Sequence, residues 1–193
     1  MNLYDFDKTI YKYDSPAKFY FFCIKRHPRI WWHLFISSFW GVLRFFHIIN
    51  LSKYKEKFFS FILYLPDYKK DLELFWGKEI KNINFWYYDK KRDDDVICSA
   101  TPRFLMEEIV PKINPKATLV CSEIDEKTSK FKKNESNCKG ENKAKKLKEL
   151  GFVSFDKGFG DALSDVPMLK RCKKRFRVLS GGKIVEFDKK YFD

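Results

Sequence analysis

Asn2-Leu3-Tyr4-Asp5-Phe6-Asp7-Lys8-Thr9 is the stretch that determines the predicted fold. Residues 2–6 form a short apolar strand candidate, and two carboxylates, Asp5 and Asp7, stand at alternate positions at its end. Because alternate residues of an extended chain point to the same side, Asp5 and Asp7 can face one cleft. Sheets of alternating strands and helices bind ligands at the carboxyl ends of their strands, where this pair would lie. A solvated acidic turn also explains the pair, since Asp-x-Asp recurs at residues 93–95.

From residue 94 onward, short apolar runs alternate with helix-patterned segments. A charged stretch with turn character covers Asp125–Asn137. The strand candidates are Val96–Cys98, Ala117–Cys121, Phe152–Phe155 and Phe176–Leu179, and the helix candidates are Arg103–Val110, Glu141–Leu150 and Leu163–Arg171. This alternation predicts an α/β fold in which helices flank a parallel sheet.

Composition narrows the class of protein. A length of 193 residues predicts one domain, or one domain with an insertion, and 45% hydrophobic and 19% aromatic residues exclude a disordered chain. The net charge of +13 favours polyanionic partners, namely nucleic acid, an anionic membrane surface or phosphorylated substrates. Five dispersed cysteines without Cys-x-x-Cys do not indicate disulfides or a zinc site, and early acidic residues do not indicate a secretory signal. We therefore expect a reduced, cytoplasmic protein.

Residues 14–93 are aromatic and helix-patterned, with few turn signals before Leu65-Pro66-Asp67. Ile30–Leu51 contains a single formal charge, Arg44, and is long enough to cross a bilayer. On a helix its polar and small residues form one narrow stripe, which consists of His33, Ser37, Gly41, Arg44 and His47. The pattern allows a buried helix, a helix in the plane of a membrane surface, or a membrane span.

Three further motifs follow strand candidates or open helices. Ser99 and Thr101 end the strand of residues 96–102, where a hydroxyl and backbone N–H groups suit either a phosphate or an ordinary helix cap. Lysines open the helix after Asn137, and an anion nearby would rationalise them, although solvated lysines are the ordinary explanation. Asp161 and Asp165 stand where the strand candidate after Phe152 meets a helix.

Four carboxylates in one cleft, Asp5, Asp7, Asp161 and Asp165, would raise each other's pKa values. Mg²⁺ removes that penalty and is the natural occupant of an all-oxygen site that also takes phosphate. Carboxylate, hydroxyl, ammonium and divalent cation are together the parts that phosphoryl transfer requires.

The ordered set Asp5-x-Asp7-x-Thr9, Ser99, a helix-opening lysine and Gly160-Asp161-x-x-x-Asp165 resembles the haloacid dehalogenase (HAD) superfamily, and within it the phosphoserine-phosphatase-like branch. That branch carries a helical cap inserted just after the first motif. The resemblance therefore implies a Rossmann-like catalytic core at residues 1–13 and 94–193, with an all-helical cap at residues 14–93.

The resemblance also implies roles for single residues. Asp5 would be the nucleophile that forms an aspartyl-phosphate, Asp7 the general acid and base, and Ser99 a hydrogen-bond donor to the phosphoryl group. Mg²⁺ would be held by the Asp5 carboxylate, the Asp7 backbone carbonyl and Asp161, with Asp165 as a ligand or just behind one.

The catalytic lysine has two candidates. Lys143 is preferred because apolar residues follow it at +4 and +7, and Lys139 is the alternative, also as a phosphate ligand. The remaining substrate- and phosphate-binding candidates are Thr9, Ala100 and Asp14, although Asp14 suits a helix cap equally well. Lys8 departs from the glycine that is common in the first motif.

The aromatic, basic cap favours an amphiphilic phosphate over phosphoserine, and the membrane-associated phosphatidylglycerophosphatases belong to this same branch. The alternatives are a soluble phosphoserine-type phosphatase and a non-catalytic protein that binds nucleic acid or a membrane surface. Binding of nucleic acid is not expected, because it leaves the carboxylates unexplained. A single span through Ile30–Leu51 would separate Asp5 from Ser99 and Asp161, so we expect at most a peripheral position on the inner face of the membrane.

Overall fold

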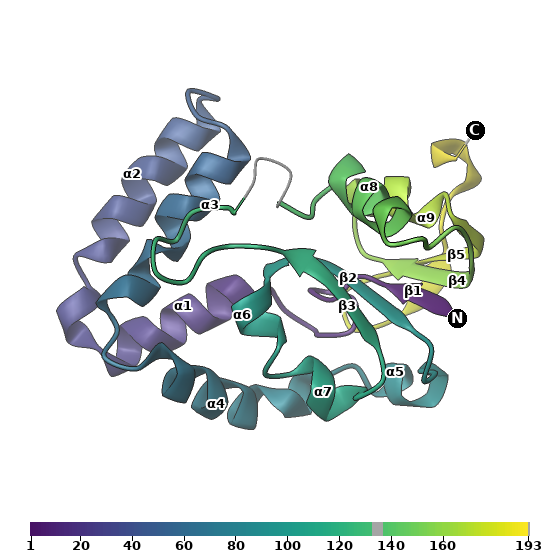
Figure 1. The fold of residues 1–193 in the computed structure, drawn as a ribbon, viewed down its shortest axis with the longest axis horizontal. Helices are drawn as coiled ribbons and strands as arrows, with labels where there is room; N and C mark the ends of the chain where they lie inside the picture. The colour runs from purple at the N-terminus through teal and green to yellow at the C-terminus, as the bar shows by residue number, and fades with distance from the viewer. Residues whose placement is uncertain (133–136, 193) are drawn as a thin grey trace.

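The computed structural model describes residues 1–132 and 137–192. Six strands form one sheet in the order β3-β2-β1-β4-β5-β6 (Figure 1). Neighbouring strands are parallel from β3 to β5, and β6 runs antiparallel to β5. The strands are β1 (Asn2–Tyr4), β2 (Val96–Pro102), β3 (Thr118–Ser122), β4 (Phe155–Gly160), β5 (Cys172–Val178) and β6 (Ile184–Glu186). The predicted α/β fold with a parallel sheet is confirmed, with one antiparallel edge strand added.

Alternation along the central strands fills both faces of the sheet. Tyr4 and Ile97 point to one face, where Tyr4 stacks on Phe159 with ring centroids 4.8 Å apart. Leu3 and Val96 point to the other. The helices α6 (Arg103–Met106) and α7 (Val110–Ile113) cover the first face, and α8 (Glu141–Glu149) and α9 (Val166–Leu169) cover the second. Burial on both faces explains the continuous apolar run Val96–Cys98 at the start of β2.

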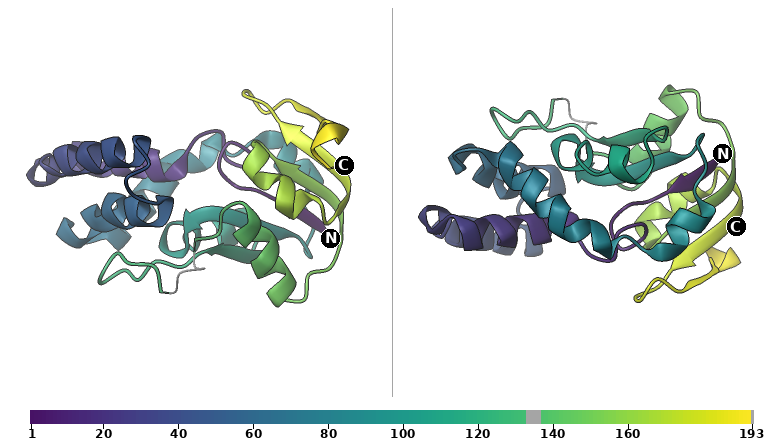
Figure 2. Two further views of the ribbon diagram at one scale, coloured as in Figure 1. Left: turned by 90° about the horizontal axis from the view of Figure 1, so that it is seen from above. Right: turned by 90° about the horizontal axis from the view of Figure 1, so that it is seen from below.

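Five helices lie between β1 and β2. They are α1 (Ser15–Arg26), α2 (His33–Phe45), α3 (Leu51–Phe59), α4 (Tyr68–Glu79) and α5 (Phe85–Lys90), with short 3₁₀ turns at Pro28–Ile30, Ser60–Tyr64 and Ile80–Asn82. Figures 1 and 2 show α1, α2 and α3 beyond the carboxyl ends of the strands, so this helical segment borders the edge of the sheet where ligands bind.

The stretch Ile30–Leu51 is not one continuous helix. A 3₁₀ turn ends at Ile30, α2 has 13 residues, and the chain turns at His47, whose φ of 58° is left-handed. The Asn50 side chain then accepts a hydrogen bond from Lys53 N at 2.8 Å and starts α3. Within residues 1–132 and 137–192, none of the helices has both the length and the apolar composition that crossing a bilayer requires.

The polar stripe of α2 points inward and its aromatic face points outward. His33 and Ser37 are buried, and Gly41 faces Tyr54 of α3. The His33 ring lies 3.1 Å from the Tyr20 hydroxyl through Nδ1 and 3.0 Å from the Ser60 hydroxyl through Nε2. On the outer face, the exposed apolar residues are Trp31, Trp32, Phe35, Phe39, Val42, Phe45, Phe46 and Ile48, with Phe35 80% exposed. We call these eight residues the α2 apolar face.

Several predicted boundaries are wrong for identifiable reasons. The expected helix Arg103–Val110 is divided into α6 and α7, because Pro111 favours the first turn of a new helix. Gly151, with φ 80°, ends α8, and Phe152 N donates to Leu147 O at 2.9 Å, so β4 begins only at Phe155. The turn expected over Asp125–Asn137 includes residues 133–136, which lie outside the described residues.

Candidate active site

A cavity of about 420 Å³ opens at the carboxyl ends of β1, β2 and β4. The core contributes Asp5 and Asp7 from the loop after β1, hydroxylated residues from β2, and Asp161 and Asp165 from the loop after β4. The helical segment contributes an apolar wall from α3, made of Leu51, Tyr54, Phe58 and Phe59. The cavity is therefore polar at one end and apolar at the other.

Lys143 joins two of the carboxylates. Its Nζ donates to Asp5 Oδ1 and, at 2.7 Å, to Asp165 Oδ1, and all three side chains are buried. Burial raises the pKa of Asp5 well above its usual range, against the opposing charge of Lys143. Burial alone would lower the pKa of Lys143, but the Asp5 and Asp165 carboxylates outweigh it and raise that pKa. Lys143 is therefore a permanently charged ammonium between two acids.

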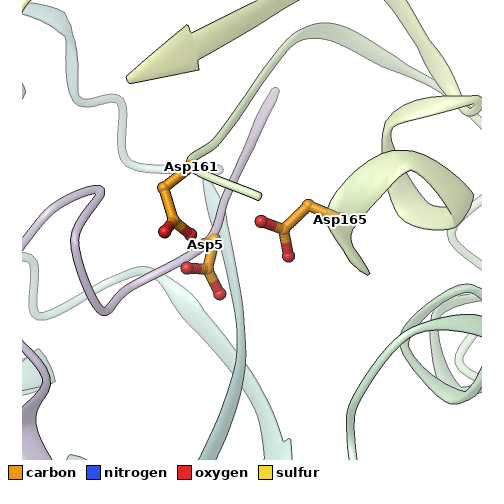
Figure 3. A group of neighbouring side chains, drawn as sticks. All are labelled: Asp5, Asp161 and Asp165. Atoms are coloured by element: carbon orange, nitrogen blue, oxygen red, sulfur yellow. The ribbon is translucent and has the colours of Figure 1, made fainter. Parts of the chain in front are cut away.

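Asp5, Asp161 and Asp165 point toward one another in Figure 3. One carboxylate oxygen from each lies within 4.8 Å of the others. Burial and the charge of Asp165 raise the pKa of Asp161. One lysine only partly relieves the mutual repulsion of these three carboxylates. Their oxygens are hard donors, so the cluster fits a divalent cation such as Mg²⁺.

Asp165 is held against the backbone of β4. At Gly160, a Cβ would lie 2.9 Å from Asp165 Oδ2, so a larger residue would displace this carboxylate. Ala162 N donates to the same Oδ2 at 3.2 Å. The glycine before Asp161 therefore allows a second acid to approach the sheet closely.

Asp7 points away from the three clustered carboxylates. Its Oδ1 accepts from Ser15 N at 2.8 Å, and its Oδ2 accepts from the Thr101 hydroxyl. Burial and the nearby charge of Asp14 raise the pKa of Asp7 to about 6. The start of α1 and the end of β2 thus orient a carboxyl group that exchanges its proton near neutral pH.

The remaining candidates occupy different positions. Ser99 is buried, lines the cavity and accepts a hydrogen bond from Thr101 N at 3.1 Å, and Ala100 also lines it. Thr9 is fully buried and is not among the cavity-lining residues. Asp14 borders the cavity and caps α1 by accepting from Ala17 N at 2.9 Å, and Lys139 borders it from an exposed position, four residues before Lys143.

Sequence reasoning missed Lys55 of α3. Its Nζ donates to Ala100 O at 2.8 Å and to Asn137 Oδ1 at 2.9 Å, so it links the helical segment to β2. Among the described residues no carboxylate pairs with it, and burial together with Lys139 lowers its pKa to about 8. In the sequence it is one of several lysines in an amphipathic helix, which gives no signal of a site.

Known proteins were compared with this sequence and fold. The model of the haloacid dehalogenase-like hydrolase family matches residues 3–170, while no curated protein matches in sequence. A protein of unknown function from Bordetella pertussis Tohama I has a similar fold, with TM-score 0.72, 13% identity, and coverage of 91% of this chain and 87% of that one.

Two further solved structures have the fold. A phosphoserine phosphohydrolase-like protein from Francisella tularensis gives TM-score 0.56 at 15% identity, covering 90% of this chain and 84% of that one. A phosphoserine phosphatase, solved as a phospho-aspartyl intermediate analogue, gives 0.54 at 14% identity, covering 90% and 83%. At these identities the likeness is one of fold.

The parallel sheet, with acidic residues gathered at its carboxyl edge and helices inserted after the first strand, defines a Rossmann-like hydrolase. The chain belongs to the haloacid dehalogenase-like hydrolase family.

Proposed function

We propose that this protein is a Mg²⁺-dependent phosphatase that hydrolyses a phosphomonoester through an aspartyl-phosphate on Asp5. The observation that carries the proposal is the buried ammonium of Lys143 between Asp5 and Asp165, with Asp161 alongside, at the end of an open cavity. The Lys143 ammonium opposes the effect of burial on the Asp5 carboxylate and directs that carboxylate while it accepts an anionic group.

In the first step an Asp5 carboxylate oxygen attacks phosphorus, and the bond from phosphorus to the leaving oxygen breaks. The protonated Asp7 carboxyl gives its proton to that oxygen, so the product leaves as an alcohol. In the second step Asp7 takes a proton from water, the water oxygen attacks phosphorus, and Asp5 is released with inorganic phosphate. A pKa of about 6 suits Asp7 to both steps near neutral pH.

The other side chains hold the phosphoryl group. Ser99 lines the cavity beside Asp5 and would donate to a phosphoryl oxygen, and the Lys55 ammonium, without a carboxylate partner among the described residues, would attract the same anion. Mg²⁺, when held by Asp5, Asp161, Asp165 and the Asp7 carbonyl, would neutralise charge on the phosphoryl oxygens.

We also propose that residues 14–93 act as a cap over a core of residues 1–13 and 94–193. The support is that α3 closes one side of the cavity and contacts β2 through Lys55. Displacement of this segment would then control substrate entry.

For the substrate we propose a lipid phosphate, such as phosphatidylglycerophosphate, taken from an anionic membrane surface. The α2 apolar face is contiguous in sequence with α3, whose Leu51 and Phe58 form the apolar wall of the cavity. Aromatic side chains suit the headgroup boundary, and a net charge of +13 is attracted to anionic lipid. An acyl chain could thus remain in contact with apolar side chains while the phosphate reaches Asp5.

A soluble phosphoserine-type phosphatase is the second candidate function. It is favoured by the fold shared with a phosphoserine phosphatase and by Asp14, which borders the cavity where it could bind a substrate amino group. It leaves the exposed α2 apolar face without a role.

The test is hydrolysis of para-nitrophenyl phosphate with Mg²⁺ and with EDTA, followed by a panel that includes phosphatidylglycerophosphate and phosphoserine. We expect Mg²⁺-dependent hydrolysis, with the lipid preferred over phosphoserine. Hydrolysis that EDTA does not affect would contradict the metal, a preference for phosphoserine would contradict the lipid, and inactivity toward every ester would contradict the phosphatase.

A further inference from the structure

A second cavity, of about 550 Å³, adjoins the first. The two share Lys8, Asp14 and Asp161, so they meet beside the carboxylate cluster. The second cavity extends from there to the turn between β5 and β6, and its lining includes Lys12, Asn84, Arg177 and Gly182.

The wall of this cavity is fixed by close contacts between three parts of the chain. Asn84 is buried and donates from Nδ2 to Thr9 O at 2.7 Å. Gly182 packs closely against the Asn84 side chain. A Cβ on Gly182 would lie 2.6 Å from Asn84 Oδ1, and the φ of 81° also favours glycine. The loop after β1, the start of α5 and the β5–β6 turn are thereby held together around one space.

Three cations line the cavity without a carboxylate partner. Among the residues that the structure describes, Lys8, Lys12 and Arg177 form no ion pair. Arg177 donates from Nε to Asp161 O at 3.1 Å, which directs this cation to the boundary between the cavities. Lys8 adopts a left-handed φ of 59°, its N–H donates to Tyr13 O at 3.1 Å, and its side chain lines both cavities at the same boundary.

The two acids in the cavity also have other partners. Asp161 belongs to the carboxylate cluster, and Asp14 is engaged at the N-terminus of α1 by Ala17 N. Asp14 also precedes Ser15, whose N–H binds Asp7, the proposed acid for the leaving group. Through Asp14, the second cavity thus adjoins the part of the site that holds the proposed acid for the leaving group.

We infer that the second cavity binds a second phosphate-type anion of the substrate, on its leaving-group side. Lys8, Lys12 and Arg177 would contact that anion while the monoester phosphate lies at Asp5. This inference rests on the proposed phosphatase function and deepens it, because it selects substrates with two phosphate groups, whether the second belongs to a lipid headgroup or to a water-soluble compound.

The kinetic test uses propane-1,3-diol monophosphate and propane-1,3-diol bisphosphate with the full chain and Mg²⁺. One charge-assisted contact is worth about a tenfold change in affinity. We expect kcat/KM to favour the bisphosphate, and Lys12→Gln to reduce that preference about tenfold. Lys69→Gln, which removes an equal charge from exposed α4 and lines neither cavity, should keep it. An equal preference in wild type and Lys12→Gln would overturn the inference.

A binding measurement separates this inference from the proposed function. Calorimetry with propane-1,3-bisphosphonate and propylphosphonate, which no phosphatase hydrolyses, should show tighter binding of the former, dependent on Lys12. Tighter binding of the bisphosphonate would support the second anion site even if the protein hydrolyses no ester. Equal binding of the two phosphonates would overturn it even if the protein hydrolyses monoesters. Once the soluble compounds show dependence on Lys12, a short-chain lipid with a phosphodiester next to its monoester, in mixed micelles, distinguishes the two sources: a larger Lys12 effect for the lipid assigns the second anion to a lipid headgroup, and a larger effect for the bisphosphate assigns it to a water-soluble compound.

Discussion

The active-site cavity and the α2 apolar face reverse the usual distribution of residues in opposite ways. In the cavity, charged side chains are buried, and Lys143 is only 2% exposed. On α2, aromatic side chains are exposed, and Phe35 is 80% exposed while His33 behind it is buried. Both regions contradict the rule that apolar groups lie inside and charged groups outside.

The two regions differ in how the free-energy cost of burying charged groups or exposing apolar groups is offset. The buried charges compensate one another, since Lys143 contacts both Asp5 and Asp165. The buried polar groups of α2 are likewise hydrogen-bonded, but no described residue covers its aromatic face. Each such side chain would gain about 1.5–3 kcal/mol on burial. The buried carboxylates thus find part of their compensation within the chain, whereas the α2 apolar face has the composition of a surface that a partner completes.

The largest expected effect tests the cavity. Asp5→Asn keeps the shape of the side chain but removes the attacking carboxylate, one proposed metal ligand and one partner of Lys143. We expect kcat for para-nitrophenyl phosphate to fall by about six orders of magnitude, as for replacement of another catalytic nucleophile. In the wild type, a hydroxylamine-labile phosphoryl group should be found on Asp5 by mass spectrometry. Near-wild-type, Mg²⁺-dependent turnover by Asp5→Asn would exclude the mechanism.

The next effect separates the two lysines. Lys143→Ala leaves two buried carboxylates without their shared cation, so we expect kcat to fall at least about a hundredfold. The free energy of unfolding should also fall, by about 3–5 kcal/mol in EDTA. Lys139→Ala removes an exposed cation from the same cavity and should cost about fivefold or less. Steady-state kinetics and urea unfolding measure both, and the reverse ranking would transfer the catalytic role by one helical turn.

Local patterns predicted more of the core than of the helical segment. The strand–helix alternation predicted the sheet, and Leu147, four residues after Lys143, is buried against it, which directs Lys143 toward Asp5. The proximity of Asp5, Asp161 and Asp165 followed from one rule, since parallel strands end at the same edge. The position of Lys55 depends on how α3 packs against β2, a long-range contact that no spacing in the sequence encodes.

In the helical segment, the periodicity of polar residues identified a helix correctly but did not predict where that helix ends. The stripe of polar residues was identified, but the sequence could not show that it would face inward or that the helix would end at Phe45. The turn depends on a left-handed His47, a conformation that only a few per cent of non-glycine residues adopt. The second cavity was equally invisible, because Lys8, Lys12 and Arg177 meet only in the folded chain.

The third effect concerns the α2 apolar face. Phe35, Phe39 and Phe45 are exposed on α2, whereas Trp31 donates its indole N–H to Ile24 O and Trp32 packs on Tyr64. Replacing the three phenylalanines with Ser should therefore preserve the fold. It should weaken binding to anionic vesicles at least about tenfold, because each side chain contributes on the order of 1.5 kcal/mol of transfer energy.

A matched control replaces three exposed apolar residues away from α2, Phe85, Leu150 and Val153, with Ser. Flotation with phosphatidylglycerol vesicles at low salt should release only the α2 variant, and both should hydrolyse para-nitrophenyl phosphate. If the wild type itself does not float with the vesicles, the membrane surface is excluded as the partner, while the chemistry at Asp5 is unaffected.

The smallest effect is the contribution of His33 to the pH dependence of the free energy of unfolding. Ser60 donates its hydroxyl proton to Lys57 O at 2.8 Å, so it accepts from His33 Nε2–H, and Nδ1 is left to accept from Ser37 or Tyr20. This network needs a neutral ring. Burial accordingly lowers the pKa of His33 to about 4.

Since the folded-state pKa is below the unfolded value of about 6.5, His33 stabilises the fold fully above about pH 6.5 and progressively less as the pH falls toward 4. At about pH 5 the unfolded chain has bound a proton that the folded chain has not, and the loss is about 2 kcal/mol. Asp7, whose folded-state pKa is raised to about 6, opposes this loss over the same pH range, so the His33 contribution is measured as a difference between variants. Urea unfolding followed by tryptophan fluorescence should give the same pH dependence for the wild type and for His47→Gln, whose replaced side chain is exposed. His33→Gln should be less stable at neutral pH but should lose about 2 kcal/mol less than the wild type between pH 7 and 5, and an unchanged pH dependence would mean that the polar side of α2 is not closed around a neutral imidazole.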